Sequence, residues 1–161
     1  MICRSCDSTN LSSILDLGVQ PWCNDFLSED RVGKENTYPL NLMHCDDCGL
    51  LQLSHTVAKE TMFGDHAYLS GMTTTLINHF YEVASENVEQ FNIKKDDLVV
   101  DIGGNDGSQL QQYRKAGIDN VLNIECAKRV SEVSRKNGIR TITEYFNKES
   151  FKEHLGEKFV K

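Results

Sequence analysis

Ten residues near the middle of the chain constrain its fold more than any other stretch. Positions 98–107 read Leu-Val-Val-Asp-Ile-Gly-Gly-Asn-Asp-Gly, so an apolar run ends at Asp101 and three glycines follow it. Glycine is needed where the backbone takes a positive φ or approaches a ligand closely, and residues 109–116 then have helical composition. The stretch predicts a strand, a tight turn and a helix start, whose free N–H groups face a polar ligand.

A second acid follows at the end of the next apolar run. Glu125 comes directly after residues 121–124 and lies 24 positions beyond Asp101. In a doubly wound sheet, an acid at the tip of the next parallel strand is placed to accept hydrogen bonds from the two ribose hydroxyls of an adenosine group. These two acids around a glycine turn predict a site for an adenosine-containing cofactor.

The glycine spacing separates two kinds of adenosine cofactor. The dinucleotide fingerprint is Gly-x-Gly-x-x-Gly, and counting from either Gly103 or Gly104 the second and third glycines are both missing. The pattern Asp-x-Gly-x-Asn-x-Gly resembles the first motif of class I methyltransferases that use S-adenosylmethionine (SAM). A negative Asp101 suits a cationic sulfonium and ammonium ligand and would repel a diphosphate. We therefore expect SAM, the alternative being a glycine turn in some other α/β domain.

Four of the six cysteines form two pairs with metal-ligand spacing. Cys3-x-x-Cys6 and Cys45-x-x-Cys48 are separated by 38 residues, and four thiolates complete the tetrahedral shell of a structural zinc ion. The long spacer exceeds that of a usual zinc ribbon, so we expect a small subdomain around the ion. His44 adjoins the second pair and is the rival ligand.

Disulfide bonds are the alternative use of these thiols, and they require an oxidising compartment. The N-terminus Met-Ile-Cys-Arg-Ser-Cys is not a signal peptide, and no apolar run approaches the length that spans a membrane. We therefore expect a cytoplasmic protein with reduced thiols and no membrane partner. The remaining cysteines, Cys23 and Cys126, are predicted to be small buried residues and not ligands.

Charge is distributed unevenly along the chain. Residues 1–93 hold 13 acids and four Lys or Arg, a net charge of −9, and residues 94–161 hold 11 acids and 13 Lys or Arg, a net charge of +2, which together give the total of −7. Proteins that bind nucleic acid use Lys and Arg to contact phosphates. The acidic N-terminal half therefore argues against a zinc ribbon that binds nucleic acid.

Apolar patterning divides the chain into three regions. We expect a zinc-binding module at residues 1–60, a connecting segment with a long helix at 61–93, and a partial SAM-binding, Rossmann-like domain at 94–161. Alternation of strands and helices from residue 97 predicts an α/β class with a doubly wound parallel sheet and ligand at the strand C-termini. The expected elements are strands at 11–17, 38–44, 50–53 and 139–142, a helix at 73–90, a helix stop at Gly138 and an N-cap at Asn147.

Three features together resemble one family, the C-methyltransferases that act on nucleotide-linked deoxysugars. They are the two cysteine pairs, the helix entry Tyr68-Leu-Ser-Gly-Met-Thr-Thr, and the motif Asp-Ile-Gly-Gly-Asn-Asp-Gly. The resemblance implies a zinc module followed by a class I methyltransferase core, with zinc on the four paired cysteines. The residues expected at the cofactor are Tyr68, Asp101, Gly103, Gly104, Asn105, Gly107 and Glu125. Gly104 stands where serine is common, which we treat as a mild departure because both residues are small.

The resemblance also implies a reaction, in which a base removes a proton next to a keto group and the carbanion attacks the sulfonium methyl group. Such a core has more strands than this chain, which has room for three, with 158–161 as the start of a fourth. We expect the acceptor site and the base to lie outside the chain, the isolated chain to be inactive, and an exposed sheet edge to allow self-association. The alternative is a non-catalytic zinc-stabilised module that binds SAM or another protein.

Overall fold

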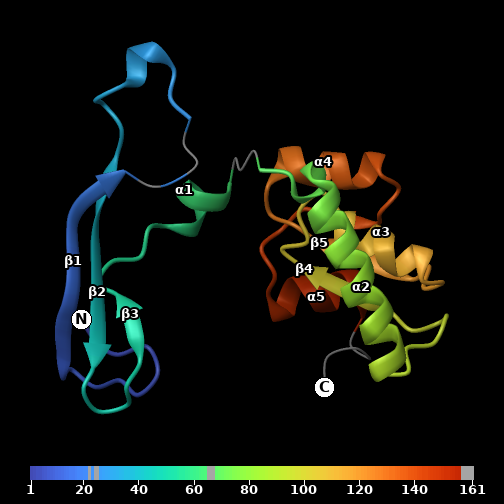
Figure 1. Ribbon diagram of the computed structural model, residues 1–161, viewed down its shortest axis with the longest axis horizontal. Coiled ribbons are helices and arrows are strands. Elements are labelled where there is room, and N and C mark those ends of the chain that lie inside the picture. The colour runs from blue at the N-terminus through green and yellow to red at the C-terminus, as the bar shows by residue number, and fades with distance from the viewer. Residues whose placement is uncertain (22, 24–25, 65–67, 157–161) are drawn as a thin grey trace. The chain divides into compact units, whose positions relative to one another are not determined.

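The computed structural model describes residues 1–21, 23, 26–64 and 68–156, and the expected fourth strand at 158–161 lies outside these residues. The chain divides into two compact units, Met1–Met62 and Phe63–Lys161. The first unit is built on an antiparallel sheet and the second on a parallel one (Figure 1). Each unit is therefore described by itself.

The sheet of the first unit follows the order β1-β2-β3. Its strands are β1 (Leu11–Pro21), β2 (Thr37–Cys45) and β3 (Leu51–Leu53), which confirms the three expected extended pieces. The pairing of β1 with β2 is interrupted by two register shifts, so the strand of 11 residues fits against one of nine. A 3-10 turn, Glu29–Arg31, lies between β1 and β2, and the short helix α1 (Lys59–Phe63) follows β3.

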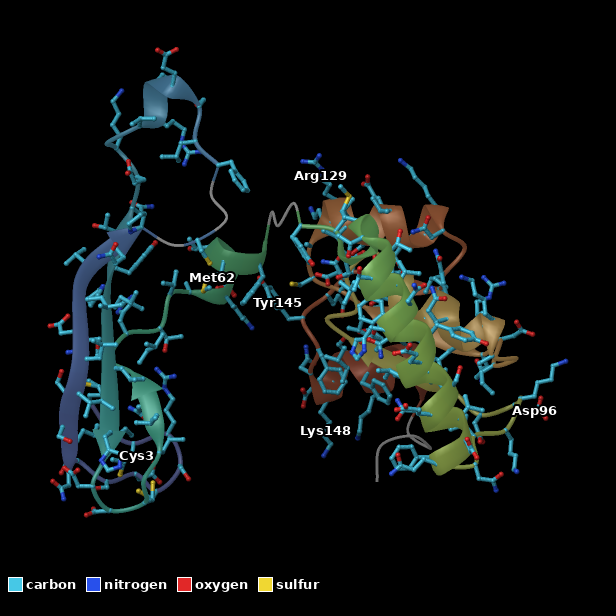
Figure 2. All side chains as sticks on the ribbon, in the orientation of Figure 1. Cys3, Met62, Asp96, Arg129, Tyr145 and Lys148 are labelled. Carbon is cyan, nitrogen blue, oxygen red and sulfur yellow. The ribbon has the colours of Figure 1, made fainter. Side chains whose placement is uncertain are left out.

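The interior of the first unit is small and contains sulfur. Among its described residues, the buried side chains are Cys3 and Cys45, both fully inaccessible, and Gln52. Cys3 lies at the end of the sheet where β1 begins and β2 ends (Figure 2). Apolar side chains along β1 are exposed to solvent: Leu15 and Leu17 are each 51% exposed. The sheet itself therefore buries little hydrocarbon.

The second unit contains a parallel sheet in the order β4-β5-β6, flanked by helices. This confirms the predicted α/β class with a partial Rossmann-like core. Its strands are β4 (Val99–Ile102), β5 (Val121–Ile124) and β6 (Thr141–Ile142). Its helices are α2 (Thr74–Gln90), α3 (Ser108–Lys115), α4 (Lys128–Lys136) and α5 (Lys148–Leu155), and a 3-10 turn at Ser70–Met72 precedes α2.

Alternation along β5 produces two apolar layers, one on each face of the sheet. Val121 packs with residues of α2 and α3, whereas Leu122 and Ile124 pack with Ile142 and with Phe151 of α5. A parallel strand covered on both faces is expected to be apolar throughout. All four residues of β5 are indeed buried, including one polar residue, Asn123.

The helix ends of the second unit follow the predicted local rules. Gly138 takes φ +77° after α4, a left-handed conformation that glycine adopts without strain. The side chain of Asn147 accepts a hydrogen bond of 2.8 Å from the Ser150 N–H, so Asn147 is the N-cap of α5 as expected. The third strand is shorter than predicted, because Ile139 leaves the ladder and packs into the core beside α3.

Candidate metal centre and cofactor site

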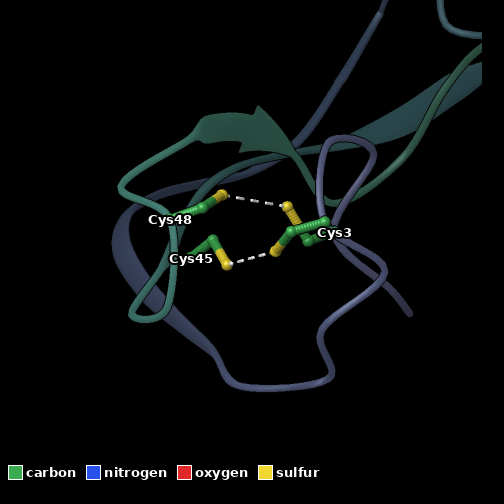
Figure 3. Close-up of side chains that lie close together, drawn as sticks. Cys3, Cys45 and Cys48 are labelled. Atoms are coloured by element: carbon green, nitrogen blue, oxygen red, sulfur yellow. Dashed lines mark hydrogen bonds between the residues drawn. The ribbon is translucent and has the colours of Figure 1, made fainter.

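The four paired cysteines converge at one end of the antiparallel sheet. The sulfur atoms of Cys3, Cys6, Cys45 and Cys48 all lie within 4.8 Å of one another, and the Cys3–Cys48 and Cys6–Cys45 sulfurs are 3.6 Å apart (Figure 3). Four thiolates at about 2.3 Å from a tetrahedral zinc ion would stand about 3.8 Å from each other. The donor set and its spacing therefore fit a closed structural zinc site.

Backbone geometry prepares both cysteine pairs for a metal. The Ser5 N–H points at the Cys3 sulfur at 3.5 Å, and the backbone N–H groups of Ser5 and Cys6 lower the pKa of the Cys3 thiol to about 6. In the second pair, Gly49 takes φ +78° and its N–H donates to the Cys45 carbonyl at 2.8 Å. Such a turn after a Cys-x-x-Cys sequence brings both sulfurs to one side.

Gln52 connects the first cysteine pair to β3. It is 5% exposed, its Oε1 accepts a hydrogen bond from the Arg4 N–H at 2.9 Å, and its Nε2 donates to the Ile2 carbonyl at 3.1 Å. The one amide side chain thus binds the backbone on both sides of Cys3. Gln52 was not predicted from the sequence, where the available signal is a single glutamine between two leucines in a short apolar run.

The remaining candidates in this region lie outside the sulfur cluster. His44 Nδ1 is 2.9 Å from Asp46 Oδ1, so the rival ligand is engaged with a carboxylate, and the described metal-ligating cluster contains the four cysteines without it. Cys23 is exposed, which makes its predicted burial wrong. Cys126 belongs to the second unit and is half-buried.

A cavity lies at the C-terminal end of β4, where the sequence predicts the cofactor. Its volume is about 180 Å³. Gly103 takes φ +74° there, and a Cβ atom added to it would have no neighbour within 4 Å. The residues that line the cavity are Ser70, Phe80, Asp101, Gly103, Gly104, Asn105 and Gln109.

Asp101 is a half-buried acid on the wall of this cavity. Burial, and secondly the charge of Glu125, raise the pKa of its carboxyl group above the ordinary value. Within the described part of the chain, no hydrogen bond to the Asp101 carboxylate is found. A buried carboxylate without a partner is costly, so this wall favours a cationic or hydrogen-bond-donating ligand.

Gly104 is tightly packed, so its small size matters more than the mild departure from serine suggests. A Cβ atom at this position would lie 2.7 Å from Asp101 Cγ and 2.6 Å from Asn123 Oδ1. Both neighbours are short side chains on adjacent strands of the sheet, so neither can move away as a long flexible side chain would. The departure from serine therefore has a steric cause in this chain.

Two other predicted residues bind the protein's own backbone, and a third packs against side chains of the core. Glu125 is 7% exposed and accepts hydrogen bonds from the N–H groups of Asn105 at 3.1 Å and Ala127 at 2.8 Å. The side chain of Asn105 binds the segment before α2, including the Tyr68 carbonyl at 2.9 Å. Gly107 packs against α4 and the residue Ile139 that follows it, since a Cβ on Gly107 would lie 2.7 Å from the Ser134 hydroxyl and 2.9 Å from Ile139 Cγ1.

Asn123 is a polar residue of this site that the sequence analysis missed. It is fully buried, and its Nδ2 donates to the Asn105 carbonyl at 2.9 Å and the Ser134 Oγ at 3.0 Å. Its Oδ1 is buried and has no hydrogen-bond partner among the described residues. The signal available in the sequence is an amide that interrupts an apolar run directly before Glu125.

Comparison with known proteins agrees with this geometry in both units. Residues 3–63 match a family described as "Putative zinc binding domain". The chain is also 29% identical to the C-methyltransferase NovU of Streptomyces niveus over 148 residues, which cover 91% of the chain and 35% of that protein. The chain thus spans about a third of the length of this relative.

These matches confirm the predicted resemblance to the N-terminal portion of a C-methyltransferase. The matched zinc-binding region contains all four cysteines of the sulfur cluster. The longer match continues through the glycine loop, since it covers nearly the whole chain. Across the part of the chain that the structure describes, no helix is both long and apolar enough to cross a membrane.

Proposed function

We propose that this chain is the N-terminal portion of a SAM-dependent C-methyltransferase. Cys3, Cys6, Cys45 and Cys48 would hold one structural zinc ion, and the cavity beside β4 would hold SAM. The four-thiol geometry and the match to a zinc-binding family support the first site. The observation that carries the second is Asp101, a half-buried carboxylate on the cavity wall without a hydrogen bond from the described residues.

The residues around the cavity have distinct roles in this proposal. Asp101 faces the cationic methionine end of the ligand, and Gly103 lets the ligand approach the loop backbone closely. Glu125 accepts from two backbone N–H groups and from the Cys126 thiol, and its remaining lone pairs would accept the ribose hydroxyls. When bound, SAM supplies the activated methyl group, and this chain binds and orients it.

The proposed acceptor is a nucleotide-linked keto-deoxysugar, in line with the resemblance described above. Proton removal next to its keto group requires a positioned base, and none of the described cavity residues is free to serve as one, because Asp101 is assigned to the cation. We therefore place the base and the acceptor site in sequence outside this chain. The chain alone would bind SAM without transferring the methyl group.

Calorimetry on the 161-residue chain tests the cofactor assignment. SAM and its demethylated product, S-adenosylhomocysteine, should both bind with one site per chain, and NAD should not bind. We expect modest affinity, because about 180 Å³ is below the roughly 300 Å³ at which ligand cavities begin. Binding of NAD as tightly as SAM would reject the proposal, as would methyl transfer from labelled SAM to a panel of keto-sugars by this chain alone.

The second candidate is a zinc-stabilised interaction module that takes a partner strand. One observation favours it: β4 pairs with β5 alone among the described strands, and Ile102 at its end is 56% exposed. Exposed strand edges recruit extended segments from other chains or from a second copy. A chain that associates through this edge and binds neither SAM nor its product would support this alternative over the methyltransferase.

A further inference from the structure

A short segment ahead of α2 lies against the glycine loop. We call residues 68–72 the strap. Asn105 binds it at two points: its Nδ2 donates to the Tyr68 carbonyl at 2.9 Å, and its Oδ1 accepts from the Ser70 N–H at 3.0 Å. The two partners are 35 and 37 residues away along the chain. The Asn105 side chain therefore stabilises a tertiary contact.

Asp106 continues this contact by one residue. Its Oδ2 accepts from the Gly71 N–H at 2.8 Å, while its Oδ1 accepts from the Ser108 N–H at 3.1 Å at the start of α3. Asp106 is 4% exposed, so both bonds are shielded from water. The approach is close, because a Cβ atom on Gly71 would lie 2.4 Å from the Ser108 hydroxyl oxygen.

The strap forms one wall of the proposed cofactor cavity. Ser70 belongs to the strap and lines the cavity together with Asp101 and Gly103 from the end of β4. Asn105, which holds Ser70, has φ +51°, a left-handed conformation that is uncommon outside glycine. The loop thus places Asn105 where its amide meets the strap backbone.

We propose that Asn105 and Asp106 are positioning residues that hold the strap so that Ser70 closes the cavity that Asp101 also lines. The inference rests on the proposed function and deepens it, because it identifies what shapes the SAM site. Releasing the strap removes one wall and leaves backbone N–H groups without partners. The ligand then loses contacts and shielding from water on that side.

The test compares two single variants of the full chain, each of which replaces an asparagine by glycine. Asn105→Gly keeps the left-handed backbone, which glycine adopts freely, and removes the amide that holds the strap. Asn92→Gly is the matched control, because Asn92 has the same φ of +51° at an exposed position after α2. We expect Asn105→Gly to weaken binding of S-adenosylhomocysteine about tenfold and Asn92→Gly to leave it unchanged.

Hydrogen exchange separates positioning from general destabilisation. In Asn105→Gly the Ser70 amide should exchange faster, while amides of β5 keep their protection. Gly71→Ala supplies a second route that leaves Asn105 in place, because its Cβ would lie 2.4 Å from Ser108 Oγ and 2.9 Å from Asp106 Oδ2 and push the strap away. It should weaken binding in the same direction.

The outcomes distinguish this inference from the proposed function. Unchanged exchange at Ser70 in Asn105→Gly would overturn the inference, as would faster exchange with unchanged ligand affinity in both strap variants. Failure of the wild-type chain to bind S-adenosylhomocysteine would overturn the proposed function, whereas the exchange measurement would still report whether Asn105 holds the strap.

Discussion

The two units of this chain are built around different interiors. In the first, the fully inaccessible side chains among the described residues are the cysteines Cys3 and Cys45, and long apolar side chains of β1 remain in solvent. In the second, β5 is buried on both faces between two apolar clusters. The first unit thus resembles a fold assembled around an ion, and the second a fold assembled by hydrocarbon burial.

This difference shows that the length and topology of a unit decide whether metal binding or apolar burial stabilises it. A unit of about 60 residues with one small antiparallel sheet buries too little apolar surface to offset the entropy of ordering its backbone, so a metal supplies the balance. A parallel sheet needs helices on its faces, and those crossovers bring enough apolar side chains to form a core.

Removing the metal should have the largest effect, and it should be confined to the first unit. Binding of zinc to four thiolates contributes about 10–16 kcal/mol that is coupled to folding. Chelation, or Cys45→Ser, should therefore abolish amide protection in residues 1–62 while β5 stays protected. Metal analysis and hydrogen exchange measure this, and Cys23→Ser, at an exposed cysteine, is the control. Simultaneous loss of order in both units would show that they share one interior.

A cavity in the second unit should produce the converse result. Leu122 is fully buried, and Leu→Ala in such a position costs about 2–5 kcal/mol. Leu122→Ala should lower the unfolding free energy of the parallel sheet and leave the zinc content at one per chain. Ile102→Ala, at a side chain that is 56% exposed, should change stability by less than about 1 kcal/mol. Zinc loss in Leu122→Ala would contradict the separation of the two interiors.

Gln52 offers a finer test of the metal-centred unit. Its amide binds the backbone on both sides of Cys3, and residues that orient metal ligands typically contribute 10–100-fold to metal affinity. Gln52→Ala should weaken zinc binding by about this factor in competition with a chromophoric chelator. The exposed Gln20 of β1 is the matched control as Gln20→Ala. Equal affinity in both variants would mean that the cysteines alone set the site.

Asp101→Asn should give the smallest effect and separate binding from stability. Because burial and then the charge of Glu125 raise the pKa of Asp101 above 3.8, the ionised form is disfavoured in the folded chain. The neutral amide should therefore raise the unfolding midpoint slightly at pH 7. It should also weaken the binding of SAM severalfold more than the binding of S-adenosylhomocysteine, whose sulfur carries no charge.

The same group predicts a pH dependence. SAM affinity in the wild type should be full above the raised pKa of Asp101 and fall as the pH drops through it, because protonation removes the anion that faces the cation. Titration by calorimetry between pH 4 and pH 7 measures this. A SAM affinity that is independent of pH, or equal in Asp101→Asn, would assign cation recognition to other residues.

Local sequence determined the elements of both units. The spacing of the cysteine pairs predicted which four sulfurs meet, and the helix stop at Gly138 and the N-cap at Asn147 lie where their side-chain chemistry requires. These features depend on neighbours within a few residues, or on a metal-ligand pattern, and both can be read along the chain. The α/β class followed from strand and helix periodicity for the same reason.

Only the tertiary structure decided how the polar residues of the loop are used. The sequence marks Asn105 and Glu125 as ligand contacts, yet both bind backbone groups brought from distant parts of the chain. Gly104 is excluded from carrying a side chain by Asn123 on the neighbouring strand. Such roles depend on which backbone N–H groups and side chains meet after folding, and every buried polar group must find its partner there. Sequence therefore specifies which residues surround the site, and packing decides which of them face a ligand.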